Sequence, residues 1–193
     1  MAREDQKMRS EKVRQAILDT ALQIGIEEGF QEVSIRRIVD RMKYSTGVIY
    51  YHFKDKQEII DAIDASESAN FAAIIRSMQE DSLGAVENMR ITFRRVMRLA
   101  MEEPEKYNLI VLHKYSRRNP EDPPLLGYLA ANLKAAMEAG QVRSMDPLRM
   151  AFSVWSSFLG FHLVLSRRSG LSQEEADALF QTQFDIMLRG ILA

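Results

Sequence analysis

A short stretch of this chain, residues 34–56, gathers side chains that together can bind the phosphates and read the base edges of nucleic acids. Six of its residues are basic and two are acidic, so the stretch carries a charge of +4 in a 193-residue chain whose formal net charge is −1. Ser, Thr, Tyr and His side chains, which can hydrogen-bond phosphate oxygens, lie between these charges. The stretch therefore predicts a local binding site for double-stranded DNA.

Each of these residues has a plainer explanation when it is taken singly. Arg37, Lys43 and Lys54 would be solvated surface charges, and His52 would be a surface histidine. The aromatic residues of the stretch would be core residues. Their ordered arrangement after a helix cap and a turn favours the DNA-binding interpretation.

Two short helical patterns position these side chains. Ser34 is the expected N-cap of the first of them, and a turn at Lys43 and Tyr44 leads to the second, over about residues 45–51. These are the proportions of a helix-turn-helix, whose second helix enters the major groove of DNA.

Helical periodicity also dominates the rest of the chain, and no strand pattern is present. Asp55 and Glu58 form the acidic version of a capping box at the start of a helix that extends to about residue 80. The other expected helices cover residues 10–28, 85–103, 105–118, 124–139, 147–168 and 173–192. The sequence thus predicts an all-α fold of about nine helices. A helix-turn-helix DNA-binding domain would occupy residues 1–56, and a larger ligand-binding and dimerisation domain residues 57–193.

Composition excludes several other classes of protein. Cysteine is absent, which rules out disulfides, zinc–thiolate sites and thiol nucleophiles. No apolar run reaches about 18 residues, and the charged N-terminus lacks a signal sequence, so we expect a cytoplasmic protein with no membrane partner. No metal-binding helix motif, phosphate-binding loop or nucleophile elbow is present, so no cofactor and no enzymatic activity are predicted. An all-α enzyme with carboxylates from separate helices is the remote alternative.

The string IYYHFKDKQEII, residues 49–60, closely resembles the TetR family of bacterial transcriptional regulators. Members of that family share a hydrophobic-Tyr-aromatic-His-Phe stretch followed by a Lys that opens the fourth helix. The resemblance is specific over roughly residues 13–63. Beyond them only the helix pattern and the stretch AGQVRSMDP, residues 139–147, look similar.

The resemblance implies a homodimer that places two third helices in successive major grooves of a palindromic operator. Ser34 would cap the second helix and touch a phosphate, and Arg36 would pair with a base edge, most plausibly guanine. The groove-entering residues would be Ser45, Thr46 and Gly47, and those contacting phosphates Tyr50, Tyr51, His52 and Lys56. The set of expected DNA contacts is completed by Arg37, Lys43, Tyr44, Val48 and Lys54.

Three residues depart from the family pattern. Lys43 stands where a Gly is usual, which predicts a distorted turn or a residue with a side chain at positive φ. Tyr44 replaces a small aliphatic residue. Val48 replaces a Thr that many relatives carry, and its methyl groups could meet a thymine methyl.

The resemblance also implies a sensor function for the C-terminal part, in which a small, largely apolar effector releases the protein from DNA. The expected pocket lining is Phe93, Met97, Tyr107, Ile110, His113, Tyr128, Met137, Trp155, Phe158 and His162. The expected dimer interface is Trp155, Leu159, Leu179, Phe180, Phe184, Met187 and Leu188. The alternatives are that the pocket residues are ordinary core, that the interface residues are the core of a monomer, and that a protein partner or no ligand controls the dimer.

Overall fold

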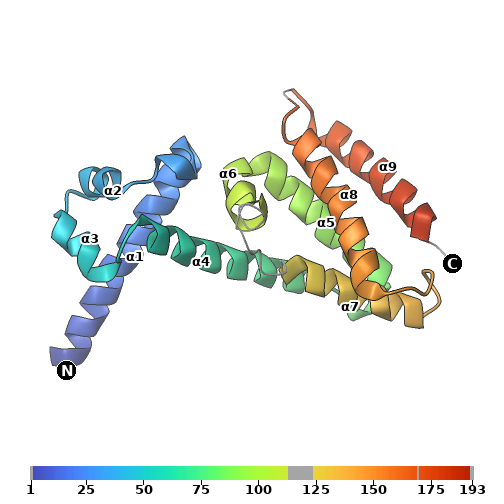
Figure 1. Cartoon of the computed structure of the whole chain (residues 1–193), viewed down its shortest axis with the longest axis horizontal. Helices are drawn as coiled ribbons and strands as arrows, with labels where there is room; N and C mark the ends of the chain where they lie inside the picture. The colour runs from blue at the N-terminus through green and yellow to red at the C-terminus, as the bar shows by residue number, and fades with distance from the viewer. Residues whose placement is uncertain (1, 113–123, 169, 192–193) are drawn as a thin grey trace. The chain divides into compact units, whose positions relative to one another are not determined.

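The computed structural model describes residues 2–112, 124–168 and 170–191 of the chain (Figure 1). Over these residues the chain forms nine α-helices and no β-strand. The all-α prediction is confirmed.

The chain divides into two compact units, Met1–Phe71 and Ala72–Ala193. The division falls inside helix α4, Lys56–Ser77, whereas the sequence placed the domain boundary at residue 56. The first half of α4 belongs to the N-terminal unit because it buries Ile59, Ile60 and Ile63.

The N-terminal unit contains α1 (Ala2–Glu28), a 3-10 turn η1 (Phe30–Glu32), α2 (Ile35–Met42) and α3 (Thr46–His52). An apolar core fixes these short elements, and its members include Ile17, Ala21, Ile24, Ile38, Ile49 and Phe53. Seven residues are too few for a stable helix in water, so α3 depends on the burial of Ile49 and Phe53. Helix α1 begins well before the predicted residue 10. Its first turns were missed because they are charged and show no apolar periodicity.

The turn between α2 and α3 has an unusual backbone at Lys43. Its φ of 57° and ψ of 31° lie in the left-handed region, and its N–H donates to the carbonyl of Val39 at 2.7 Å. The prediction that a residue with a side chain would occupy positive φ here is confirmed. A left-handed conformation costs a non-glycine residue about 1–2 kcal/mol.

The C-terminal unit contains α5 (Gly84–Glu102), α6 (Pro104–Tyr107), α7 (Pro124–Glu138), α8 (Pro147–Leu165) and α9 (Gln173–Ile191). Helix α5 packs against α7, α8 and α9 (Figure 1). In place of the helix predicted over residues 105–118, α6 ends at Tyr107 and continues as a π-helix over Asn108–Leu112, and residues 113–118 lie outside the described residues.

Stacked aromatic rings form the centre of the C-terminal core. The rings of Phe93 and Phe158 lie 4.0 Å apart, and those of Phe180 and Phe184 lie about Phe158 at 5.9 and 6.0 Å. By length and composition alone α8 could span a membrane, as core helices of water-soluble proteins also could. Its buried face contributes Phe158 to this core.

Arginine side chains of α5 contact residues of α9 beside this core. Arg90 lies 4.4 Å from the Phe184 ring and 3.4 Å from Asp185, and Arg94 lies 5.4 Å from the Phe180 ring. These ion pairs and cation–π contacts tie α9 to α5 along the length of both helices.

A candidate DNA-reading surface and a candidate effector pocket

Helix α3 presents most of its side chains to solvent. The buried side chains of Ile49 and Phe53 mark the side of α3 that faces the core, and the opposite side of the helix is exposed to solvent. The exposed residues on this side and in the preceding turn, here called the reading surface, are Tyr44, Ser45, Thr46, Gly47, Tyr50 and Tyr51. Tyr50 and Tyr51 are 57% and 78% exposed, which shows that they are not the core aromatics of the alternative interpretation.

Arg36, on α2, carries a highly exposed cation. Its side chain is 92% exposed, and within the described part of the chain its ion pair is a 3.9 Å contact with Asp40, one turn along the same helix. An exposed pair of this kind contributes little stability, so the guanidinium can leave it for a base edge.

Arg37 is placed differently, and its predicted DNA contact stays a prediction. Its guanidinium binds Glu28 and lies 3.0 Å from Glu32, so two carboxylates from before α2 already neutralise it. Arg41 makes similar pairs, at 2.7 Å to Glu27 and 2.8 Å to Glu28. The hydrogen bond from Arg41 lowers the pKa of Glu27. The charge of +4 counted along residues 34–56 therefore overstates the positive charge of the folded surface.

Several other predicted contacts have structural roles in the free protein. The Ser34 hydroxyl accepts a hydrogen bond from the Arg37 N–H at 3.3 Å, which confirms its role as N-cap. Lys56 donates from Nζ to the carbonyl of Gln31 at 3.0 Å and so joins the start of α4 to η1. Phosphate contacts by these two residues remain predictions.

The remaining predicted contacts surround the reading surface. Lys43 and Lys54 are exposed, and Val48 and His52 are half-buried. The His52 ring meets the Tyr51 ring edge-on at 5.0 Å, which holds both side chains at the end of α3. The predicted capping box of α4 is present, since the Glu58 N–H donates to Asp55 at 2.9 Å and Glu58 accepts from the Lys54 N–H at 2.6 Å.

Gly47 has no structural need to be glycine within this chain. A Cβ built on it would meet one side-chain atom within 4 Å, the Ser45 hydroxyl at 3.7 Å, which is an ordinary contact. We expect Gly47→Ala to stabilise the fold by up to about 1 kcal/mol, because alanine is the better helix former. The same change should weaken operator binding about tenfold, because the added methyl group would obstruct close approach to DNA.

Gly127→Ala is the matched control for Gly47→Ala. Gly127 lies on α7 and is exposed, and no described residue lies within 4 Å of a Cβ added to it. Thermal unfolding and operator titration of both variants would separate the effects. A Gly47→Ala protein with unchanged operator affinity would refute the close approach.

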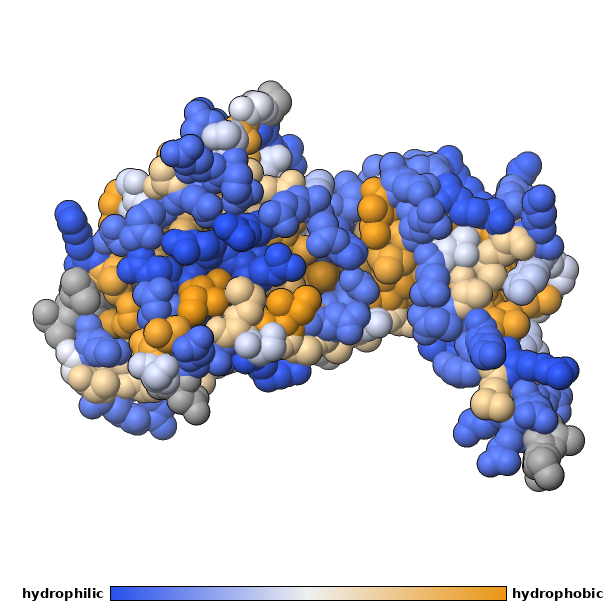
Figure 2. All heavy atoms as spheres, turned by 180° about the vertical axis from the view of Figure 1, so that it is seen from behind, coloured by the Kyte–Doolittle hydropathy of each residue, from blue (hydrophilic) through white to orange (hydrophobic). Residues whose placement is uncertain are grey.

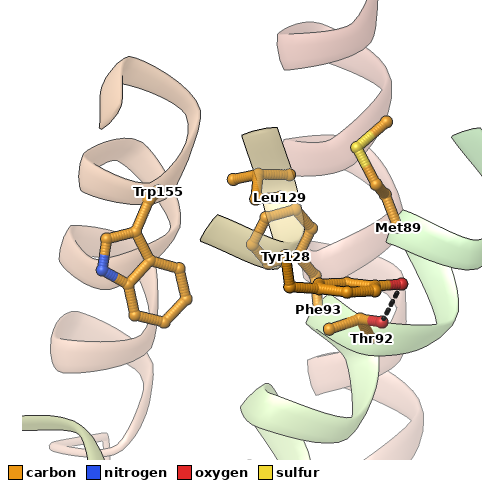
Figure 3. Close-up of a pocket in the computed structure, with 6 residues that line it drawn as sticks. All are labelled: Met89, Thr92, Phe93, Tyr128, Leu129 and Trp155. Atoms are coloured by element: carbon orange, nitrogen blue, oxygen red, sulfur yellow. Dashed lines mark hydrogen bonds between the residues drawn. The ribbon is translucent and has the colours of Figure 1, made fainter. Parts of the chain in front are cut away.

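The C-terminal unit contains a small cavity that is lined by side chains of α5, α7 and α8 (Figure 3). Its lining is Met89, Thr92, Phe93, Tyr128, Leu129 and Trp155. The Tyr128 hydroxyl lies 3.3 Å from the Thr92 hydroxyl and also accepts a hydrogen bond from Gln79. The cavity holds about 10 Å³, roughly enough for one water molecule, whereas small-molecule pockets measure about 300–1,000 Å³.

The cavity shares three residues with the predicted pocket, namely Phe93, Tyr128 and Trp155. Met97, Tyr107, Ile110, Phe158 and His162 are buried in the core and do not line this cavity, and Met137 is half-buried, so their place in an effector pocket stays a prediction. His113 lies outside the described residues. Met89, Thr92 and Leu129 also line the cavity and were not among the predicted residues. Met89 and Thr92 precede Phe93 by four residues and one residue on the same helix, so helical spacing around Phe93 was a usable signal for Met89.

His162 is fully buried among aromatic rings. Its ring lies 6.0 Å from Tyr107 in an edge-on arrangement and 5.9 Å from Phe158. Neither ring nitrogen meets the geometry of a hydrogen bond within the described residues. Burial lowers the pKa of His162 to about 3, and the nearby backbone of Phe93 opposes this shift only in part.

The expected dimer interface also needs correction at three residues. Trp155, Phe180 and Phe184 are 3%, 0% and 0% exposed in the single chain, so they have no surface left for a partner. Their apolar side chains fill the subunit's own core. Leu159, Leu179, Met187 and Leu188 are half-buried and keep part of their surface.

A different set of apolar side chains on α8 and α9 is open to solvent. Phe152, Val164 and Ile186 are 62%, 67% and 64% exposed, and Leu163 is 38% exposed. On α8, Ser156 and Gly160 lie between Phe152 and Val164 at four-residue spacing, so small residues separate the large ones on one side of the helix. We call Phe152, Ser156, Gly160, Leu163, Val164 and Ile186 the outer face.

Comparisons with known proteins agree with this geometry. Residues 17–63 match the family described as bacterial regulatory proteins, tetR family. The HTH-type transcriptional repressor AcnR of Corynebacterium efficiens is 30% identical over 154 residues, which cover 78% of this chain and 75% of the relative.

Solved structures show the same fold. The structure of SmeT, the repressor of the Stenotrophomonas maltophilia multidrug efflux pump SmeDEF, superposes with a TM-score of 0.73 at 22% identity, over 93% of this chain and 90% of SmeT. A Rhodococcus sp. RHA1 protein of unknown function gives a TM-score of 0.76 at 18% identity, over 94% and 96% of the two chains.

An exposed helix-turn-helix on a helical body defines a DNA-binding regulator. The chain belongs to the TetR family of bacterial transcriptional regulators, and the resemblance drawn from residues 49–60 is confirmed. It is a DNA-binding transcriptional regulator whose relatives are regulators and not enzymes.

Proposed function

We propose that this protein is a cytoplasmic repressor that binds a palindromic operator on the chromosome as a homodimer and leaves it when a small, largely apolar effector binds the C-terminal unit. The observation that carries the proposal is the reading surface. Its side chains are exposed around a helix whose inner side is fully buried. Such a helix has a fixed position and a free outer side, as reading a DNA groove requires.

The outer face supports the homodimer. Its large apolar side chains are exposed on two helices that contact each other, and exposed apolar surface is a recognised property of protein interfaces. A two-fold axis between two copies would present two reading surfaces to one side of a DNA duplex.

The nearly closed cavity supports effector control. A ligand larger than a water molecule can enter only a conformation in which the cavity is wider, so it binds that conformation selectively. Differential affinity of this kind is the condition for a ligand to shift the dimer away from its DNA-binding state. If a protein partner controlled the dimer, this cavity would not be needed. A dimer that needs no signal would respond neither to a small molecule nor to a protein partner.

Selection of random DNA duplexes on the purified protein tests the proposal. We expect two inverted half-sites, one helical turn (about 34–36 Å) or a multiple of it apart. Recovery of no preferred sequence would contradict the operator-binding function. A metabolite screen on the selected operator then separates effector control from the two alternatives.

Arg36→Ala tests the base contact. Loss of a bidentate pair with guanine should reduce discrimination at one base pair of each half-site by roughly 1–3 kcal/mol. Repeating the selection with the variant measures this, with Arg143→Ala as the control, since Arg143 is exposed in the C-terminal unit. The same preferred sequence from Arg36→Ala and wild type would refute the contact.

A further inference from the structure

A second concavity of the C-terminal unit lies between the end of α4 and the middle of α5. Its lining, here called the arginine groove, is Ile74, Met78, Ile91, Arg94, Arg95 and Arg98. Its volume is about 330 Å³, within the lower part of the range of small-molecule pockets. It shares no residue with the cavity of Figure 3.

Positive charge in the arginine groove is not balanced. Arg94 and Arg98 share one carboxylate, that of Asp177, at 3.9 and 3.4 Å. Arg95 makes no ion pair or hydrogen bond with any described residue. Three guanidinium groups thus face a single acid among the parts of the chain that the structure describes.

The three arginines also have unused donors. The Nε atom of each is buried and has no hydrogen-bond partner within the described residues. A buried donor without a partner costs free energy. The side chains of Arg94 and Arg98 are nevertheless 42% exposed, so an anion in the groove can approach the accessible part of these guanidinium groups. The groove is therefore predisposed to bind an anionic group.

The remainder of the lining is apolar. Ile74 and Met78 are large side chains that are 41% and 40% exposed, and Ile91 adds a third apolar wall. On the face of the molecule in Figure 2, strongly hydrophilic and hydrophobic side chains likewise lie next to one another. A ligand that satisfies both parts of the groove must combine a charged end with an aliphatic part.

We infer that the arginine groove binds a small aliphatic carboxylate, with the carboxylate held by Arg95 and its neighbours and the chain lying on Ile74 and Met78. A planar carboxylate matches the fork of a guanidinium, which makes this pair stronger than a neutral hydrogen bond. Only the further step, that this ligand acts as an effector, rests on the proposed function.

Calorimetric titration of the full-length protein with decanoate, in the absence of DNA, tests the inference. We expect decanoate to bind, and decanol and acetate to bind at least about tenfold more weakly, because each lacks one of the two parts. Equal affinity for decanoate and decanol would overturn the inference, as would the absence of decanoate binding at millimolar concentration.

Two pairs of variants locate the site. Arg95→Gln should weaken decanoate binding at least about tenfold, whereas Arg149→Gln, the same change at an exposed position of α8, should not. Met78→Glu should abolish binding, because it places a competing carboxylate beside the arginines, whereas Met145→Glu, at an exposed position before α8, should not. Wild-type affinity in Arg95→Gln and Met78→Glu, with circular dichroism showing folded proteins, would overturn the site.

Operator binding, measured separately without decanoate, tests the proposed function. A protein that binds its operator but shows no heat with decanoate contradicts the groove and supports the regulator. A protein that binds decanoate through Arg95 but selects no operator supports the groove and contradicts the regulator.

Discussion

Val164→Glu is expected to split the homodimer and to lower operator affinity at least about 100-fold. Val164 is 67% exposed in the single chain, so the subunit itself should fold normally. In a dimer joined through the outer face, the new carboxylate would be buried without a partner, at a cost of several kcal/mol. A loss of about 2.7 kcal/mol already corresponds to a 100-fold change in affinity.

Sedimentation at micromolar concentration and operator titration measure the two effects. Leu83→Glu is the matched control, because Leu83 is a 41% exposed apolar residue of the same unit and lies outside the outer face. A Val164→Glu protein that sediments as a dimer would rule out this interface. Phe184→Glu is not an equivalent test, because Phe184 is fully buried and the change would disrupt the subunit core.

The free energy of unfolding should fall as the pH is lowered from 7.5 to 5, in part because of His162. Its pKa is about 3 in the folded protein, against a usual value of 6.5 in an unfolded chain. The folded pKa is depressed, so below pH 6.5 the unfolded chain binds a proton that the folded chain does not, and stability is lost progressively down to about pH 3. The expected contribution is about 2 kcal/mol at pH 5.

His162→Leu isolates this contribution from that of other groups, such as Glu27, whose lowered pKa acts in the same direction. Leucine removes the titrating ring and its unsatisfied nitrogens at similar volume, so the difference in stability between pH 7.5 and pH 5 should shrink by about 2 kcal/mol. Denaturant unfolding at fixed protein concentration measures it, since dimer stability depends on concentration. An equally steep pH dependence in His162→Leu would show that the ring is accessible to protons when folded.

The elements of the fold could be predicted because their causes are local. Apolar residues at helical spacing predicted the helices, and Ser34, Asp55 and Glu58 predicted two helix starts through hydrogen bonds that span three residues. The positive φ of Lys43 was anticipated because the family resemblance places a Gly at this position of the turn. These features depend on neighbours in the sequence.

The errors arose where side chains meet partners that are distant in sequence. Helices α8 and α9 are apolar on more than one side, and periodicity cannot tell which side faces the subunit core. Phe180 and Phe184 were therefore assigned to the dimer interface although they are fully buried in the single chain, whereas Phe152 on the exposed side was not considered. Arg37 was counted as a free cation because its acidic partners Glu28 and Glu32 lie outside the stretch that was counted.

The lining of the cavity also depends on contacts between residues that are distant in the sequence. Ten aromatic, apolar and histidine residues fitted an effector pocket by type, but the volume left open depends on how α5, α7 and α8 pack. The structure leaves space beside Met89 and Leu129, and fills it around Phe158. Residue types predict which side chains are inside a helical body, and packing decides which of them border a void.

The closed state of the cavity in Figure 3 also determines how tightly an effector of that site would be observed to bind. If one molecule in a hundred is open at a given moment, the apparent dissociation constant is about a hundred times the intrinsic one. Sensitivity to the signal would then be set by how readily three helices separate as much as by the contacts that the signal makes. Residues remote from the effector could tune the concentration at which the gene is switched on.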